Sequence, residues 1–367
     1  MPLQFVPFEA NHIAAVAAFN QRMSEGHAAS DFLLPTEADE RVSQPDEPIQ
    51  WTRYVVLDGE QVRGGVLAMG QPGWVKGNAA RALNFQSPLA EGIVNPKYSI
   101  VAMQMVKFMQ KQADAVFMVG MGAPDRPLPK LLTASGWSVR LVPFLFRVHH
   151  TGHFLRELQM LRSSSLKRIA AQAARFTGMG AAGLAVAQRC RTKANGSIRQ
   201  ENSWGDWADE IWQRCRPNCS FAVQRDRRTL ESLYPPLDPK TKIYVIERDA
   251  KPVGWSVCFN AALRNHRHFG NLRVASILDC MADADAMPLT ATLTDREVAT
   301  QGGDLVLVNH SHSAWVQAFR SAGFLAGPSN YLLAMSKKLT ELVRAEQQGE
   351  HRIHVTRGDG DGRMHLT

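Results

Sequence analysis

Apolar and polar positions follow a recurring order along this chain, and residues 304–335 show that order most clearly. Residues 304–309 predict a strand, His310–Ser313 a polar loop and 314–322 a short helix. Gly323 is the stop of the helix, and 331–335 predict the next strand. The helix is predicted because Trp315, Phe319 and Ala322 fall on one face at helical spacing. Glycine suits the stop because it adopts a left-handed conformation at little cost.

The same order occurs earlier in the chain. Residues 115–121 predict a strand, 128–134 a short helix, Gly136-Trp137 a stop, and 138–148 a single closing strand. Gly136 and Gly323 are 187 positions apart. Similar segments that recur at nearly the same offset indicate an internal repeat, so we interpret the chain as one module written twice.

Two predicted hairpins support the repeat. Residues 51–57 and 60–69 flank Asp58-Gly59, a dipeptide that favours a tight turn with the twist of a β-hairpin. Residues 242–247 and 253–259 predict a matching hairpin. Tyr54 and Tyr244, like Gly64 and Gly254, are 190 positions apart.

Composition and length fit two globular domains. The chain has 367 residues, of which 45% are hydrophobic and 21% charged. We expect an N-terminal domain over 1–150, a helical linker over 151–196, a second domain over 197–340 and a disordered, glycine-rich tail over 341–367. No apolar run reaches the ~20 residues of a membrane span, the N-terminus lacks a secretory pattern, and five scattered cysteines suggest reduced thiols. We therefore expect a cytoplasmic protein.

The positive charge is concentrated in the connector. The net charge is +8, and residues 151–205 hold nine basic and two acidic side chains. One interpretation is a solvated helical linker between the modules. The alternative is an interfacial helix within 154–193 that is attracted to anionic lipid or to a phosphorylated partner, which would place the protein at the inner membrane face.

The element order, with helices that end in Ser-Gly-Trp or Ala-Gly-Phe before the last strand, resembles the GNAT superfamily of acyl-CoA N-acyltransferases. The resemblance covers about 3–148 and 197–338 and suggests a tandem, FemAB-like arrangement. It implies an α+β fold with two lobes, each a mixed, mostly antiparallel sheet flanked by helices. It also implies acyl-CoA as co-substrate, bound in a split between the fourth and fifth strands.

In this family the pyrophosphate lies at the N-terminus of the helix after the fourth strand, where free N–H groups favour an anion. Neither half carries the family's glycine-rich phosphate loop. The first half offers cofactor-binding candidates of small, polar and cationic type, namely Gly92, Asn95, Lys97, Tyr98 and Ser99. The second half carries Asp279, Asp283 and Asp285 there, which would repel phosphate. We therefore expect acyl-CoA in the first half only.

Four residues are candidates for proton transfer. Glu91 and Asp279 are expected at the ends of corresponding strands, where the family keeps its base, and the alternative for each is a solvated carboxylate. His310 and His312 follow a predicted buried strand, and histidine can serve as a base near neutral pH. Their alternative role is in a polar loop that precedes a helix capped by Ser313. The family's usual tyrosine acid is replaced by Leu132 and Phe319, so either another residue such as Tyr98 or Tyr331 serves as the acid, or the thiolate leaves without help.

Other signals are weaker. The histidines at 149, 150 and 153 lack the carboxylate spacing of a metal site, so we expect no metal. The glycines at 178, 180 and 183 match a dinucleotide fingerprint by letters, but they follow a helical stretch rather than a strand.

The sequence thus predicts an N-acyltransferase that moves an acyl group from acyl-CoA to an amine. The acceptor that the resemblance suggests is a sugar, an amino acid or a precursor of cell-envelope polysaccharide. One alternative is a non-catalytic tandem scaffold. Another is a FemAB-like transferase that uses aminoacyl-tRNA, although contacts with phosphate alone would be unspecific.

Overall fold

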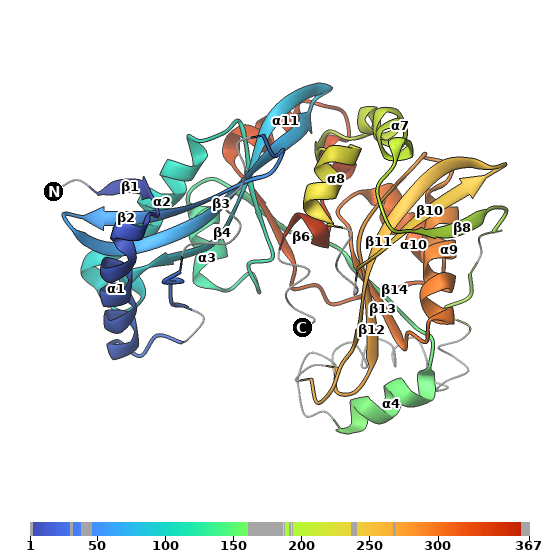
Figure 1. Ribbon diagram of the computed structural model, residues 1–367, viewed down its shortest axis with the longest axis horizontal. Coiled ribbons are helices and arrows are strands. Elements are labelled where there is room, and N and C mark those ends of the chain that lie inside the picture. Colours follow the sequence, from blue (N-terminus) through green and yellow to red (C-terminus); the bar gives the residue numbers. More distant parts are fainter. Residues whose placement is uncertain are drawn as a thin grey trace. The chain divides into compact units, whose positions relative to one another are not determined.

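The computed structural model describes residues 3–29, 32–37, 46–160, 186, 188–190, 192, 194–235, 241–266 and 269–360 (Figure 1). The chain forms two compact units. Unit 1 contains 1–73, 78–140 and 333–342, and unit 2 contains 74–77, 141–332 and 343–367. Each unit therefore takes in a segment from the other half of the sequence.

Unit 1 is built on a mixed sheet with helices on both faces. The strand order is β1 (Gln4–Pro7), β2 (Gln50–Asp58), β3 (Gln61–Val75), β4 (Asn78–Ala90), β5 (Ala115–Val119), β15 (Leu332–Met335), β6 (Ser138–Leu141). Val55 packs against α1 (Ile13–Glu25), whereas its neighbour Val56 packs in the cluster with α2 (Ile100–Gln110) and α3 (Pro127–Ala134). Adjacent strand residues point to opposite faces, so α1 covers one face and α2 and α3 the other.

Unit 2 repeats this plan. The strand order is β14 (Leu325–Gly327), β7 (Phe144–Val148), β13 (Leu305–Asn309), β12 (Arg273–Ala282), β11 (Lys251–Ala262), β10 (Thr241–Arg248), β8 (Ser197–Glu201). Its helices include α7 (Asp206–Cys215), α8 (Arg227–Leu233), α9 (Met287–Thr300) and α10 (Ser313–Ser321). Short strands β9 (Phe221–Val223) and β16 (Ile353–His354) pair in parallel. The predicted α+β architecture of two mixed sheets flanked by helices is confirmed.

The repeat extends to the register of the hairpins. In unit 1 the β2–β3 pairing shifts between Val56↔Gly64 and Leu57↔Val62. In unit 2 the β10–β11 pairing shifts between Ile246↔Gly254 and Glu247↔Pro252. All four residues of each shift are 190 positions from their counterparts. A β-bulge at the same place in both hairpins is a specific structural feature. The offset of 190 in the sequence therefore corresponds to a repeat in the structure.

The closing strand of each half lies in the sheet of the other unit. The predicted strand over 138–148 is two strands, β6 and β7, separated at Pro143, which has no N–H to donate to a ladder. β7 pairs with β13 and β14 in unit 2. β15 pairs with β5 in unit 1, through Leu333↔Val119 to Met335↔Phe117.

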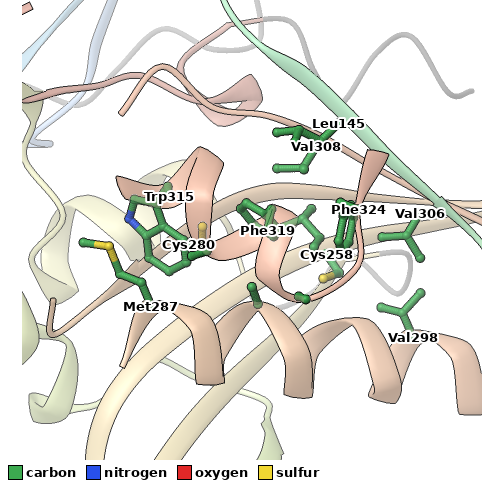
Figure 2. Packing of buried hydrophobic residues seen from close by; sticks show 14 of the residues in the cluster. Leu145, Cys258, Cys280, Met287, Val298, Val306, Val308, Trp315, Phe319 and Phe324 are labelled. Carbon is green, nitrogen blue, oxygen red and sulfur yellow. The ribbon is translucent and has the colours of Figure 1, made fainter. Parts of the chain in front are cut away.

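The core of unit 2 contains the helix–glycine–aromatic motif. Trp315, Phe319 and Phe324 are buried together with residues of α9, β12 and β13, as Figure 2 shows. Gly323 has a φ of 94°, which a residue with a side chain rarely adopts. Trp137 takes the place of Phe324 in unit 1 and stacks edge-on against Phe85. The motif is therefore a packing device in both units.

In each unit two parallel strands pair briefly and then separate. β4 and β5 pair over Ala82–Asn84, after which β4 continues to Ala90. β12 and β13 pair from Val274 to Ile277, after which β12 continues to Ala282. These are the positions of the predicted splits.

The expected disordered tail is wrong for residues 341–360. They contain the end of α11 (Lys337–Arg344), the turns Gly349–Arg352 and Arg357–Asp359, and β16. Ile353 and Val355 are fully buried at alternating positions, and Thr356 and Asp359 form a capping box. Gly358, one of the glycines that suggested disorder, is tightly placed, because a Cβ on it would collide with the Tyr234 hydroxyl. Residues 361–367 lie outside the described residues.

The connector is described only in part. α4 (Thr151–Met160) is present, with Phe154 buried and the Glu157 carboxylate accepting a bond from the Asn271 amide. The three glycines at 178, 180 and 183, and most of the predicted interfacial segment, lie outside the described residues. No helix in the described ranges combines the length and apolar content of a membrane span.

Candidate active site

The predicted cofactor-binding residues of unit 1 lie together between β4 and α2. Two short turns, Glu91–Ile93 and Pro96–Tyr98, lead into α2, and the Asn95 side chain accepts a hydrogen bond from the backbone of Lys97. A Cβ on Gly92 would lie 2.7 Å from Cα of Ser99. Gly92 therefore lets the loop fold back onto the start of the helix, which is a steric role within the chain itself.

The N-terminus of α2 has the chemistry of an anion site. Ser99 precedes the helix, but its side chain makes no capping bond, so the first N–H groups of α2 lack that partner. Lys97 is exposed, with its Nζ 5.5 Å from the Tyr98 ring centroid. The Arg63 guanidinium lies 4.0 Å over the same ring. Free N–H groups, the helix dipole and a lysine together favour a phosphate here.

Glu91 is buried and fully engaged. Its carboxylate accepts bonds from Arg22 (3.0 and 3.2 Å) and from Arg63 (3.0 Å). Arg22 also donates to the carbonyl of Val62 at 2.6 Å. The carboxylate thus ties α1 and β3 to the end of β4.

Unit 2 contains the same connection. Arg214 on α7 donates to the Asp283 carboxylate at 2.9 Å and to the Pro252 carbonyl at 3.0 Å. This bond to Asp283 raises the pKa of Arg214. Arg22 and Arg214 are 192 positions apart, as are Glu91 and Asp283. Because the connection is repeated in both units, it favours a structural role for Glu91.

The expected correspondence between Glu91 and Asp279 is wrong. Asp279 lies inside β12, next to a shift in register between Val257 and Cys258, and is not at the end of the strand. β12 ends at Ala282 and β4 at Ala90, so Asp283 is the counterpart of Glu91, and Ser87 is that of Asp279. Glu91 and Asp279 are 188 positions apart, close to the 187 between the glycine stops, whereas the ends of β4 and β12 are 192 apart, so the offset changes along the repeat.

Asp279 belongs to a buried charged cluster in unit 2. Its carboxylate accepts bonds from Arg225 Nε at 2.6 Å and from the Tyr234 hydroxyl at 3.0 Å. Arg225 also donates to Asp359 at 2.6 Å. His354 Nε2 lies 3.6 Å from Asp279. Burial alone would raise the pKa of Asp279. The charge of Arg225 and the hydrogen bonds from His354 and Tyr234 outweigh burial, so the pKa of Asp279 is lowered.

The structure brings His310 to this cluster. Its ring stacks on Trp315 and meets the His354 ring edge-on at a centroid distance of 4.7 Å. Its Nδ1 accepts a bond from the backbone N–H of His312 at 3.1 Å. His310 is fully buried, and burial, followed by the neighbouring His354, keeps its pKa well below the usual range. The ring is therefore neutral near pH 7.

His312, not Ser313, is the N-cap of α10. Its Nδ1 accepts a bond from the Ala314 N–H at 3.3 Å, while the Ser313 hydroxyl donates to the carbonyl of His351. Burial lowers the pKa of His312 to about 4. The capping bond also favours the neutral ring, because only an unprotonated Nδ1 can accept a hydrogen bond.

Four members of the cluster were missed in the sequence: Arg225, Tyr234, His354 and Asp359. Arg225 gave no signal because it lies in a polar turn. His354 and Asp359 lie in the segment for which we expected disorder. The alternation of Ile353 and Val355 was the one pattern that indicated a buried strand there.

The expected repulsion of phosphate in unit 2 must be revised. Asp279, Asp283 and Asp285 each have an arginine partner, which are Arg225, Arg214 and Arg248. A cavity of about 470 Å³ lies at the start of α9, lined by Thr192, Asn195, Gly196, Arg248, Asp249, Asp285, Pro288 and Leu289. Its charged lining is one arginine and two aspartates. Because the three carboxylates are paired with arginines, they repel a pyrophosphate less than the number of aspartates in the sequence suggested.

The three histidines near residue 150 lie beside carboxylates of unit 2. His149 bonds Asp295 at 2.9 Å, and His150 and His153 lie 3.0 and 3.1 Å from Asp304. Within the described part of the chain, no group of three or more His, Cys, Asp or Glu side chains is placed to hold a metal ion.

Solved structures that share this fold include two whose alignment covers more than 90% of this chain. One is a conserved protein of unknown function from Enterococcus faecalis, described as a probable N-acyltransferase; it is 9% identical, with 94% of this chain and 75% of that chain covered and a TM-score of 0.52. The other is a GCN5-related N-acetyltransferase from Anabaena variabilis, at 11% identity, 91% and 72% coverage and a TM-score of 0.51. No protein-family model and no curated protein matches the chain. The fold is therefore GNAT-like.

Proposed function

We propose that the protein is an N-acyltransferase that binds acyl-CoA in unit 1. The observation that supports this most directly is the split between β4 and β5. The two strands pair over Ala82–Asn84, and β4 then continues to Ala90 with no other strand beside it on that side among the described residues. The uncapped N-terminus of α2 and Lys97 follow at the end of β4.

The chemistry is transfer of an acyl group between two nucleophiles. The acceptor amine attacks the thioester carbonyl, so that a C–N bond forms and the C–S bond breaks. The amine loses a proton, and the CoA thiolate takes one up. Unit 1 would hold the donor: α2 and Lys97 face the pyrophosphate, and the free edge of β4 pairs with the pantetheine amides.

The acceptor that we expect is an amine on a sugar, an amino acid or a cell-envelope precursor. This expectation comes from the resemblance of the sequence to two-lobed acyltransferases. The names of the two structural neighbours support acyl transfer to nitrogen in general terms.

Calorimetric titration of the full chain with acetyl-CoA and with a longer acyl-CoA tests the proposal. We expect binding, and we expect Lys97→Glu to weaken it about tenfold, which corresponds to about 1.4 kcal/mol. Lys107→Glu is the matched control, because Lys107 is an exposed lysine in the last turn of the same helix. No binding of any CoA species at 1 mM, or equal effects of the two variants, would overturn the proposal.

A second candidate is a non-catalytic binding scaffold. The observation in its favour is that the candidate proton-transfer groups are engaged or buried: Glu91 and Asp279 pair with arginines, and His310 is fully buried. Leu132 and Phe319, at the position of the usual acid, are also buried. Acyl-CoA binding without release of free CoA thiol, across a panel of amines, would favour this scaffold.

A further inference from the structure

The C-terminal segment 353–359 lies in the split of unit 2. β12 and β13 stop pairing at Ile277↔Val308. Beyond this point Thr356 forms an antiparallel bridge with His310, the residue directly after β13. On the other side, a Cβ on Gly358 would lie 3.3 Å from the carbonyl oxygen of Leu278 in β12. The segment therefore separates the ends of the two strands.

Val355 and Thr356 bond the chain beyond β13 as a short added strand would, and residues 357–359 then form a turn. The backbone N–H of Ser311 donates to the carbonyl of Val355 at 3.0 Å, and the N–H of Val355 donates to the Ser311 hydroxyl at 2.8 Å. The Tyr331 hydroxyl donates to the carbonyl of Thr356. An extended chain that pairs in a split of this kind uses the contacts that a pantetheine chain would need.

An ion pair anchors the far end of the segment. Arg225 bridges the carboxylates of Asp279 and Asp359, and all three side chains are fully buried. Asp359 also accepts a bond from the Thr356 N–H at 2.8 Å. A buried charge is stable only with an oppositely charged partner. Removing either carboxylate would therefore leave the buried Arg225 guanidinium with one ion-pair partner fewer.

Unit 1 lacks the residues that receive the segment. By the register of the strands, Ser87 stands where unit 2 has Asp279, and Gly120 stands where it has His310. The cluster that binds the segment is thus specific to unit 2, since unit 1 has different residues at the two corresponding positions.

We propose that residues 353–359 are a built-in occupant of the split in unit 2, and that they confine acyl-CoA to unit 1. The identity of the excluded ligand rests on the proposed function; the filling of the split does not. Expelling the segment should open a second site for CoA.

Gly358→Ala in the full chain is the sharpest test, because the added methyl group collides with the Tyr234 hydroxyl. Gly152→Ala is the control, because a Cβ there meets nothing within 4 Å. Two measurements are made: hydrogen exchange of the amides in 353–360, and the number of CoA molecules bound by calorimetry. We expect exchange in the segment to rise at least tenfold in Gly358→Ala, and the number of bound CoA molecules to rise by one.

The outcomes separate this inference from the proposed function. One CoA in the native chain and two in the variant supports both. None in the native chain and one in the variant supports the inference and overturns the proposed function. An unprotected segment in the native chain, unchanged protection in Gly358→Ala, or a released segment with no additional CoA overturns the inference. If Gly358→Ala fails to fold, Asp359→Asn, which keeps the shape and removes the charge, is measured in the same way.

Discussion

Glu91 and Asp283 make the same connection in the two units but at different depths. The side chain of Glu91 is 3% exposed, while that of Asp283 is 25% exposed and its partner Arg214 is 42% exposed. Breaking a buried ion pair leaves an uncompensated charge, whereas an exposed pair contributes little. The repeated geometry therefore provides a matched pair of sites that differ in burial.

We expect Glu91→Gln to lower the local stability of α1 by about 3 kcal/mol, and Asp283→Asn to lower that of α7 by less than about 1 kcal/mol. Hydrogen exchange of peptides from the two helices measures both values. A Glu91→Gln protein that keeps its stability but loses acyl transfer would instead identify Glu91 as a catalytic base.

The individual site residues show where sequence reasoning reached its limit. The cofactor candidates Gly92 to Ser99 could be grouped in advance because they are contiguous and precede a helix. The cluster around Asp279 could not, because it joins side chains from four separate segments of the chain. No periodicity links such residues before the fold is known.

The connection between β13 and α10 carries two histidines that are neutral in the folded protein. The pKa of His312 is lowered to about 4 and that of His310 lies well below its usual value, in both cases mainly because of burial. The groups that act on these two rings are His354, Arg225 and Arg352, together with the Asn218 carbonyl. A depressed folded pKa means that the unfolded state takes up protons first, so stability is present above about pH 6.5 and is lost as the pH falls toward 4.

We expect α10 to lose about 2 kcal/mol of local stability from His312 alone between pH 7.5 and pH 5. Hydrogen exchange of α10, corrected for the intrinsic pH dependence, measures the loss. In His312→Asn, which keeps a capping acceptor but does not titrate, the loss should shrink. An equal loss in the variant would assign the pH dependence to other groups.

Elements were predicted well where the pattern is local. The hairpins, the helix over 314–322 and the glycine stops follow from turn chemistry and helical spacing, and the structure has them within a few residues. The C-terminal elements were missed because burial of Ile353 and Val355 depends on β9, which lies about 130 residues away in the chain. The glycine content of this segment led us to expect disorder. The short alternation of apolar residues at 353 and 355 forms a strand only because tertiary contacts stabilise it.

Each unit depends on both halves of the chain. β7 comes from the first half and lies between β13 and β14 in unit 2, while β15 comes from the second half and pairs with β5 in unit 1. The repeat was visible in the sequence, but the exchange was not, because either sheet would satisfy the apolar pattern of these strands. Which sheet a strand joins is decided by pairing across the whole molecule.

The exchange predicts how the chain behaves when it is cut. Residues 1–160 and 186–367, produced separately, should each expose an unpaired sheet edge and aggregate or remain partly unfolded. Produced together, they should assemble into a 1:1 complex with the far-ultraviolet spectrum of the intact chain. The control is a second fragment that ends at residue 330 and so lacks β15, β16 and α11; it should fail to rescue fragment 1–160. A cooperative, monomeric fragment 1–160 would instead show that unit 1 folds without β15 and that the first half is an independent domain.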